Sequence, residues 1–262
     1  LIESLVGKYL KTGIGIWRTM FEEIGEGREL IWRLFVRDLS AKYKQSVLGY
    51  VWVLVTPFIA IGTFMVLNKS GIFTIGSTDI PYPLFALIGL AVWQLFVTGI
   101  NSGCQSLVGA GDMITKINFP REVLVLASLA QALFEFGIKC VLIILFFMIF
   151  QFYPSWQIIF FPLLVLPMLI LTLGFSLILS LVHGIIRDTP TTVGILTTFL
   201  MFLTPVLYPI PANGNLFFKL NPLAALVNAP RDIIAYGYVK EPMEFIVASG
   251  LSFILFLIFW RI

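Results

Sequence analysis

The sequence carries little charge and few residues that could bind a metal. Charged residues make up 12% of its 262 residues, about half of the roughly 25% found in soluble domains. It has one histidine, His183, and two cysteines, Cys104 and Cys140, which both lie in apolar runs. We therefore expect no metal site and no disulfide. This composition excludes a soluble enzyme, a disordered regulator and a simple nucleic-acid binder.

Motifs for nucleotide binding and hydrolysis are also missing. The sequence has no G-x-x-x-x-G-K-[ST], so it is not expected to bind ATP through a P-loop. It also lacks G-x-S-x-G and H-E-x-x-H, and its polar loops are too short to build an active site. We expect no enzymatic activity and no bound cofactor or metal. A conduit through a membrane, or a subunit of one, is the favoured class.

Long apolar runs dominate the sequence. Hydrophobic residues account for 59% and the mean hydropathy is +0.98. A transmembrane helix needs about 20 predominantly apolar residues. The charge-free runs predict six spans, at about 45–68, 84–106, 122–150, 158–182, 191–208 and 244–260. The predicted fold is an all-α integral membrane protein, with its transmembrane domain at 45–262.

Two segments outside the spans have their own patterns. Residues 1–44 form a charged N-terminal arm, which contains one amphipathic helix suited to the membrane interface. Its apolar face comprises Ile31, Trp32, Phe35, Val36 and Leu39. Residues 211–240 hold apolar pieces too short to cross a membrane, split by Asn221-Pro222. They predict short re-entrant helices before the last span, or equally an amphipathic surface loop.

The basic residues predict the orientation of the chain. Of 17 Lys and Arg residues, twelve lie on the side that holds both termini. The opposite side has Lys69, Lys219, Arg231 and Lys240, and the remaining one, Lys139, lies within a predicted span. Because basic residues concentrate in the cytoplasm, both termini are expected there, in agreement with an even number of spans. No signal peptide is expected in the first 45 residues, and the initiator Met and a basic tail after the last span are expected to lie outside this sequence.

One pair of ionisable residues lies within a predicted span. Glu135 and Lys139 are four residues apart, so they share a helical face in the favourable order for an ion pair. Charges inside a membrane are costly, and we expect each residue to neutralise the other. The alternative is a proton or ion relay. It is less favoured, because no further acid or histidine extends the chain of carriers.

Six aromatic residues on the first and fifth spans are candidates to line a path for sugars, whose apolar C–H faces pack on aromatic rings. They are Tyr50, Trp52, Phe58, Phe199, Phe202 and Tyr208. The alternative for these residues is ordinary packing or anchoring at the interface.

The short loop after the second span mixes charged and apolar residues. Asp112, Met113, Ile117, Phe119 and Arg121 suit a knob that docks into a partner, or else a turn resting on lipid headgroups.

Several short motifs carry a resemblance to a known family. They are Arg37-Asp38-Leu39, the run from Lys42 to Gly49, Asn118-Phe119-Pro120-Arg121-Glu122, and Asn221-Pro222-Leu223 followed by Arg231. In this order and spacing the chain resembles the permeases of ABC-2 type polysaccharide exporters, over most of its length. Within that family it is most similar to the O-antigen permeases of the Wzm type, with teichoic-acid and capsule permeases as near relatives.

The resemblance implies a half-transporter in the bacterial inner membrane. Two copies would form a channel, lined chiefly by spans one and five. Each copy would bind a separate Wzt-like ATPase subunit, which holds ATP and Mg, through the N-terminal helix and the loop at 112–121. The cargo would be a polysaccharide on undecaprenyl diphosphate, moved from the cytoplasm to the periplasm.

The resemblance also implies a role for a group of basic residues. Arg37, Lys42, Lys44 and Arg187 would attract the lipid diphosphate, although basic residues near the cytoplasmic leaflet also attract ordinary anionic lipids. The other hypotheses are an ABC-2 exporter of a small drug or lipid, and an ion-coupled transporter that uses Glu135 and Lys139.

Overall fold

The computed structural model describes residues 22, 24, 25, 27–44, 46–71, 76, 78–114, 119–209 and 221–261. These residues form helices, and the described part contains no strand. The helices are α3 (Arg28–Lys44), α4 (Val51–Lys69), α5 (Tyr82–Gly109), α6 (Gly111–Ile114), α7 (Glu122–Ile149), a 3-10 turn η1 (Trp156–Phe160), α8 (Phe161–Ile185), α9 (Thr189–Leu203), α11 (Pro222–Tyr236) and α12 (Pro242–Arg261).

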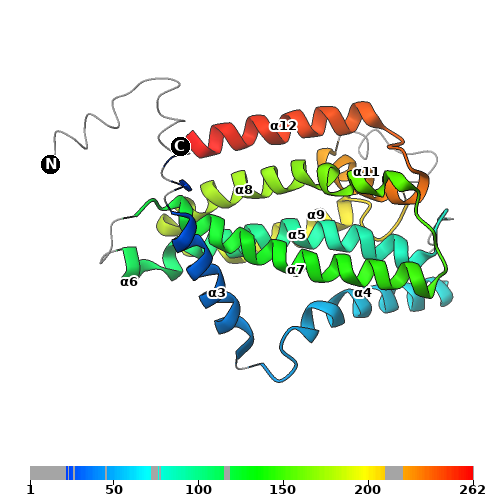
Figure 1. Ribbon diagram of the computed structural model, residues 1–262, viewed down its shortest axis with the longest axis horizontal. Helices are drawn as coiled ribbons and strands as arrows, with labels where there is room; N and C mark the ends of the chain where they lie inside the picture. Colours follow the sequence, from blue (N-terminus) through cyan, green and yellow to red (C-terminus); the bar gives the residue numbers. More distant parts are fainter. Residues whose placement is uncertain are drawn as a thin grey trace.

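The helices form a bundle around α5. Helices α12, α8, α5 and α7 run side by side, while α3 crosses the bundle near one end and α4 lies along its edge (Figure 1). Helix α5 is buried along most of its length, from Leu84 to Cys104. By contrast, α4 buries only Val53, Pro57 and Ile61. Helix α5, which is the second predicted span, therefore forms the core. Helix α4, which is the first, is loosely attached.

Five helices are long and apolar enough to cross a membrane: α4, α5, α7, η1 with α8, and α12. They correspond to five of the six predicted spans. The predicted span 191–208 differs, because α9 has only 15 residues. Such a helix is about 22 Å long, less than the roughly 30 Å of hydrocarbon. The helix stops before Pro205, because proline disfavours helical backbone in the residue that precedes it.

Small residues bring α5 and α8 into close contact. A side chain at Gly99 or Gly103 would overlap Thr172 or Ser176 of α8, so only glycine fits there. The Ser176 hydroxyl donates a hydrogen bond of 3.1 Å to the Gly99 carbonyl. Such small-residue contacts are typical of membrane helix pairs. Cys104 is buried in the same interface, and both cysteines are free thiols.

Helix α3 lies in the N-terminal arm, where the sequence predicts an amphipathic helix. Leu34 and Phe35 are buried, whereas Trp32 and Val36 remain exposed. Leu34 packs in a cluster with residues of α7. The arm is therefore attached to the bundle through one side, and it keeps an apolar side free.

Helix α11 lies in the predicted re-entrant segment, of which residues 210–220 lie outside the described part. The Asn221 side chain caps the helix by accepting a hydrogen bond from the backbone nitrogen of Leu223 at 3.0 Å. Most side chains of α11 are buried against α8, α12 and α5. The described part of the segment therefore forms a helix packed in the bundle.

Candidate functional site

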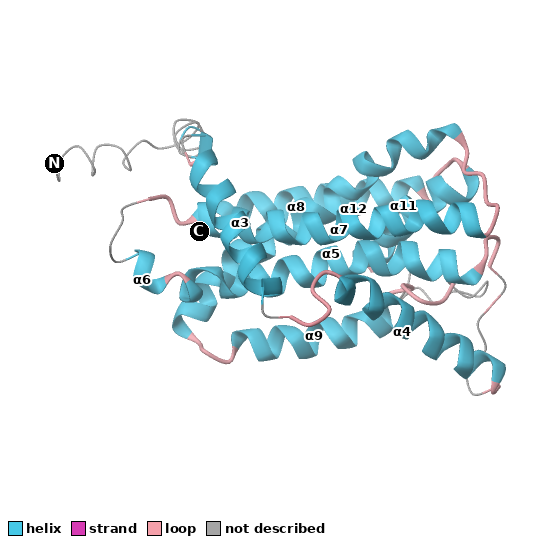
Figure 2. Cartoon of the chain, turned by 60° about the horizontal axis from the view of Figure 1, so that its bottom comes forward, coloured by secondary structure: helices cyan, strands magenta, loops and turns pink. Residues whose placement is uncertain are grey.

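Four of the six predicted aromatic residues lie on α4 and α9, each of which buries only three side chains in the bundle. Trp52 and Phe58 of α4 are half exposed, and Phe199 and Phe202 of α9 are 67% and 60% exposed. Helices α4 and α9 lie on the same side of the bundle (Figure 2). No ring contact between the two sets occurs in the described part of the chain. A single copy thus presents them on an open face and does not enclose them.

Three of the six aromatic side chains have partners in the bundle. The Phe58 ring lies 5.7 Å from the Phe146 ring of α7. The Tyr50 ring lies 4.2 Å from the Tyr43 ring and 5.8 Å from that of Phe134. The Tyr208 hydroxyl donates to the Phe202 carbonyl at 2.5 Å. These contacts position Tyr50 against α7 and tie Tyr208 to the end of α9.

Threonine side chains lie on the same two helices as the aromatic residues. The sequence analysis did not predict a role for these threonines. Thr56 and Thr63 of α4 are exposed, and so is Thr198 of α9. Their hydroxyls bond backbone carbonyls of their own helices at 2.8–3.0 Å, which leaves the oxygen lone pairs free to accept. The exposed face of α12 carries only apolar side chains and Gly250 between residues 245 and 260. The face of α4 and α9 is thus more polar than a purely lipid-facing one.

Glu135 has a different partner from the predicted one. Its carboxylate lies 2.6 Å from the Lys42 nitrogen and accepts a hydrogen bond of 3.1 Å from the Tyr43 hydroxyl, both from α3. Lys139 is only 3% exposed, and no described carboxylate lies within ion-pair distance of it. Glu135 thus forms its ion pair with Lys42, which the sequence did not predict, because tertiary packing brings the end of α3 onto the middle of α7.

The four basic residues proposed for the lipid diphosphate do not form one cluster. Arg37 bonds the neighbouring Asp38 at 2.8 Å, and Lys42 bonds Glu135. Lys44 is exposed at the end of α3, while Arg187 is exposed in the turn between α8 and α9. Lys42 and Lys44 share one end of α3, and Arg187 belongs to a separate turn.

The loop at residues 112–121, called the docking loop below, packs against α3 where it is described. Met113 and Phe119 pack against a cluster that includes Leu34 of α3 and Val123 of α7. Arg121 is exposed at the start of α7. Ile117 and the side chain of Asp112 lie outside the described residues. The part of the loop that is described therefore forms a common unit with α3.

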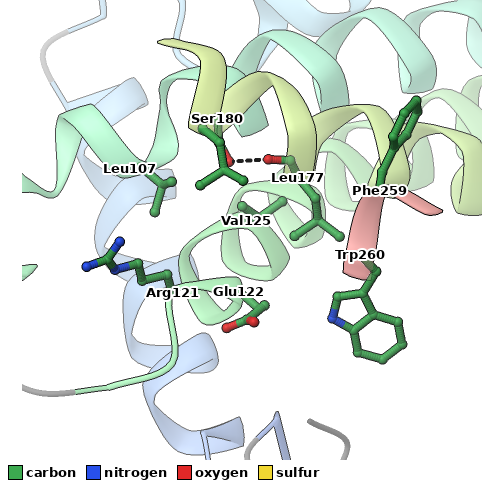
Figure 3. A pocket seen from close by; sticks show the side chains of 9 residues that line it. Leu107, Arg121, Glu122, Val125, Leu177, Ser180, Phe259 and Trp260 are labelled. Atoms are coloured by element: carbon green, nitrogen blue, oxygen red, sulfur yellow. Dashed lines mark hydrogen bonds between the residues drawn. The ribbon is translucent and has the colours of Figure 1, made fainter. Parts of the chain in front are cut away.

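A cavity of about 150 Å³ opens beside this loop, between the ends of α5, α7, α8 and α12. Arg121 and Glu122 lie at one side of it and Trp260 at the other (Figure 3). Ser180 contributes a hydroxyl, which bonds the Leu177 carbonyl at 2.7 Å. A larger cavity of about 290 Å³ between α5, α8, α9, α11 and α12 exposes no polar surface, so it does not suit a sugar.

Arg231 of α11 clamps the irregular segment after α9. The guanidinium is 4% exposed and donates to the carbonyls of Pro205 at 3.0 Å and Val206 at 2.7 Å. It also lies 3.8 Å from the centre of the Phe85 ring. Asn221 adds a bond of 3.1 Å to the Leu203 carbonyl. Non-helical backbone at membrane depth is tolerated when its polar groups are satisfied by protein, and these side chains meet that need.

A polar cluster joins the loop before α5 to the end of α11. The Tyr236 hydroxyl donates to Asp79, and Lys240 lies 3.8 Å from the centre of the Tyr236 ring. The Tyr236 hydrogen bond lowers the pKa of the Asp79 carboxyl. Burial raises the pKa of the Asp232 carboxyl to about 6, although it accepts a hydrogen bond from the Lys240 backbone nitrogen. Within the described residues, no group of acids, His and Cys is arranged to hold a metal.

The sequence was compared with known protein families. The model of the ABC-2 type transporter family matches residues 29–235, which is most of the chain. The chain belongs to the ABC-2 type transporter family. An O-antigen export system permease protein, RfbA of Myxococcus xanthus, is 28% identical over 242 residues, which cover 90% of this chain and 92% of that protein. An RfbA of Klebsiella pneumoniae is 28% identical over 209 residues, covering 77% and 78%.

A third relative of this ABC-2 chain has another named cargo. The polysialic acid transport protein KpsM of Escherichia coli is 22% identical over 217 residues, covering 79% of this chain and 82% of KpsM. The ABC-2 match begins within α3 and ends within α11, so it includes the Glu135 contact, the docking loop and the Arg231 clamp. The protein is thus a multi-pass membrane protein of the ABC-2 family, and its named relatives RfbA are permease subunits.

Proposed function

We propose that the chain is the channel-forming permease of an ATP-driven exporter of lipid-linked polysaccharide, of the O-antigen type. The supporting observation is the open face of α4 and α9, which combines aromatic rings with threonine hydroxyls. Aromatic rings pack on the apolar faces of sugars, and hydroxyls bond sugar hydroxyls without demanding one fixed pattern. The named cargo of RfbA is O-antigen, which agrees with this chemistry.

Two copies of the chain form the channel in this proposal, with the faces of α4 and α9 turned toward the path. A single copy leaves α4 and α9 largely uncovered, so a second copy would supply the missing wall. Each copy binds a cytoplasmic ATPase subunit through α3 and the docking loop. ATP and Mg belong to that subunit. The six membrane crossings comprise five long helices and α9 with its irregular extension, and both termini lie in the cytoplasm of a bacterium.

The cargo in this proposal is carried on undecaprenyl diphosphate, from the cytoplasm to the periplasm. Exposed basic residues at the end of α3 and in the α8–α9 turn attract the diphosphate. Helix α11 forms a re-entrant element on the periplasmic side.

Deletion of the gene tests the proposal. The deletion strain is expected to lose surface polysaccharide and to accumulate carrier-linked polymer inside the cell, and the wild-type gene is expected to restore export. A matched control complements with Phe253→Ala, a change on the apolar face of α12. Unchanged surface polymer in the deletion strain would discard the polysaccharide cargo.

A second candidate cargo is a small lipid or drug, which the wholly apolar cavity of about 290 Å³ favours. This hypothesis expects altered drug sensitivity or lipid content in the deletion strain, with normal surface polymer. Teichoic acid or capsule remains within the first hypothesis, and the composition of the trapped polymer distinguishes these from O-antigen.

A further inference from the structure

The corner between α3 and α4 is held on α7 by one buried carboxylate. Glu135 lies in the middle of α7, and its side chain is 8% exposed. Lys42, which bonds it at 2.6 Å, has a side chain that is 43% exposed. The carboxylate is therefore hidden in the bundle, while its cationic partner is reachable from outside.

Tyr43 supplies the second donor to this carboxylate, at 3.1 Å. Burial, and then the charge of Glu135, raise the pKa of the Tyr43 hydroxyl, so it remains a neutral donor. An ammonium and a phenol hydroxyl that converge on one carboxylate can equally bind a phosphate oxygen, because both anions accept charge-assisted hydrogen bonds. In this arrangement Glu135 occupies the donors that a phosphate would use.

Ring contacts also attach the corner to α7. The Tyr50 ring packs on Tyr43 and on Phe134 of α7, and α4 itself buries three side chains. In Figure 1 the α3–α4 corner projects away from the bundle. The Lys42–Glu135 contact thus adds an ion pair to the ring contacts that join the corner to α7.

Lys139 is the unexplained member of the cluster. It is 3% exposed, it makes no described hydrogen bond, and the acid that acts on its charge is Glu135. A buried ammonium is strongly unfavourable unless an anion offsets its charge. Glu135 lies one helical turn before it, in the order that favours an ion pair on a helix. Lys139 is therefore placed to receive the Glu135 carboxylate whenever Lys42 has another partner.

We propose that Glu135 exchanges partners when an anionic phosphate headgroup binds: the phosphate takes Lys42 and Tyr43, and the carboxylate turns to Lys139. The cluster holds two cations and one anion, so an incoming phosphate supplies an anion for Lys42 while Glu135 offsets the charge of Lys139. The exchange releases the end of α3 from α7. This inference rests on the proposed function, since the headgroup would be the diphosphate of the lipid-linked cargo.

Binding of farnesyl diphosphate to the purified full-length permease, in nanodiscs of phosphatidylcholine, tests the exchange. Titration calorimetry is used, with farnesol as the uncharged probe. Glu135→Gln removes the competing carboxylate, so binding should tighten by roughly tenfold, which is about 1.4 kcal/mol. Lys139→Gln removes the waiting partner, so binding should weaken by a similar factor, and Lys139→Arg should restore it.

The matched control is Glu29→Gln. Glu29 forms an exposed pair with Arg33 on the same helix α3, also at 2.6 Å, and this change should leave the affinity unaltered. Circular dichroism and melting temperature verify that each variant is folded. The opposite signs expected for Glu135→Gln and Lys139→Gln separate an exchange from a purely structural role, which would shift both in one direction.

The exchange is overturned if the two variants change affinity in the same direction or not at all. It is also overturned if the wild-type protein binds farnesyl diphosphate no better than farnesol. Complementation of the deletion strain decides the proposed function separately. Normal export restored by the wild-type gene, together with failed titrations, would reject the exchange alone. A deletion strain with normal surface polymer would reject the polysaccharide cargo and leave the binding result to stand by itself.

Discussion

The Arg231 guanidinium donates a hydrogen bond of 3.0 Å to the Pro205 carbonyl and so joins α11 to the segment that continues α9. The acceptors on this guanidinium are two carbonyls and the Asn228 side chain, and no carboxylate bonds it among the described residues. A buried cation held by backbone oxygens couples the position of α11 to that of α9.

Removal of the Arg231 side chain should destabilise the protein. Arg231→Met leaves two buried carbonyls without donors, and the expected loss is about 3 kcal/mol in the free energy of unfolding. Denaturant unfolding of the detergent-solubilised protein measures it. Arg33→Met, at an exposed and paired arginine of α3, is the control and should cost less than about 1 kcal/mol. Equal losses would show that the clamp does not stabilise the fold.

Gly89 should be irreplaceable for a related reason. A Cβ there would overlap the Arg231 guanidinium and the Val206 carbonyl, whereas a Cβ at Gly137 would meet nothing within 4 Å. Gly89→Ala should lower the melting temperature by several degrees, and Gly137→Ala should not lower it. Combining Gly89→Ala with Arg231→Met should cost less than the sum of the single changes, because they disturb one contact. Strict additivity would contradict that explanation.

Asp232 should make stability depend on pH. Its pKa is raised from 3.8 to about 6 in the folded protein, so folding favours the protonated carboxyl. The free energy of unfolding should therefore fall as pH rises from about 4 to about 6, and stay level above that. Asp232→Asn keeps an acceptor for the Lys240 nitrogen and should raise the melting temperature at pH 7.5 but hardly at pH 4. Melting curves at both pH values test the difference between variant and wild type.

The exposed aromatic residues should matter for transport and not for folding. Phe202→Ala on α9 should reduce polymer export severalfold in complementation, while the amount of assembled complex stays constant. Phe253→Ala on α12 is the matched control, since Phe253 is 51% exposed on an apolar face. Surface polymer is quantified on gels. Similar export by both variants would count against a path lined by aromatic residues.

The docking loop should bind its partner through charge as well as shape. Phe119 packs on the cluster around Leu34, so its replacement would also disturb the fold. The exposed Arg121 avoids this problem, and Arg121→Glu should reduce co-purification of the ATPase subunit. Lys69→Glu, at the far end of α4, should leave co-purification unchanged. Full retention of the ATPase by Arg121→Glu would remove that residue from the interface.

Local sequence patterns were sufficient to predict the helices and to assign the chain to the all-α membrane proteins. Apolar runs of span length have one stable solution in lipid, so five long helices and the amphipathic α3 could be predicted from composition and periodicity. Their bounds shifted by a few residues, as at Val51 for a span expected to begin near residue 45. The sequence also identifies Glu135 and Lys139 as unusual, because both are ionisable residues within a predicted span.

Tertiary structure decided the partners of those residues. Helical spacing alone placed Lys139 beside Glu135, but the packing of α3 across α7 delivered Lys42, 93 positions away in the chain, to the same carboxylate. The clamp by Arg231 arose in the same way, because α9 ends at Leu203 and the carbonyls of Pro205 and Val206 that follow it need donors from α11. Periodicity records which face of a helix is apolar; which polar groups meet depends on how separate helices pack, and only the folded bundle shows that.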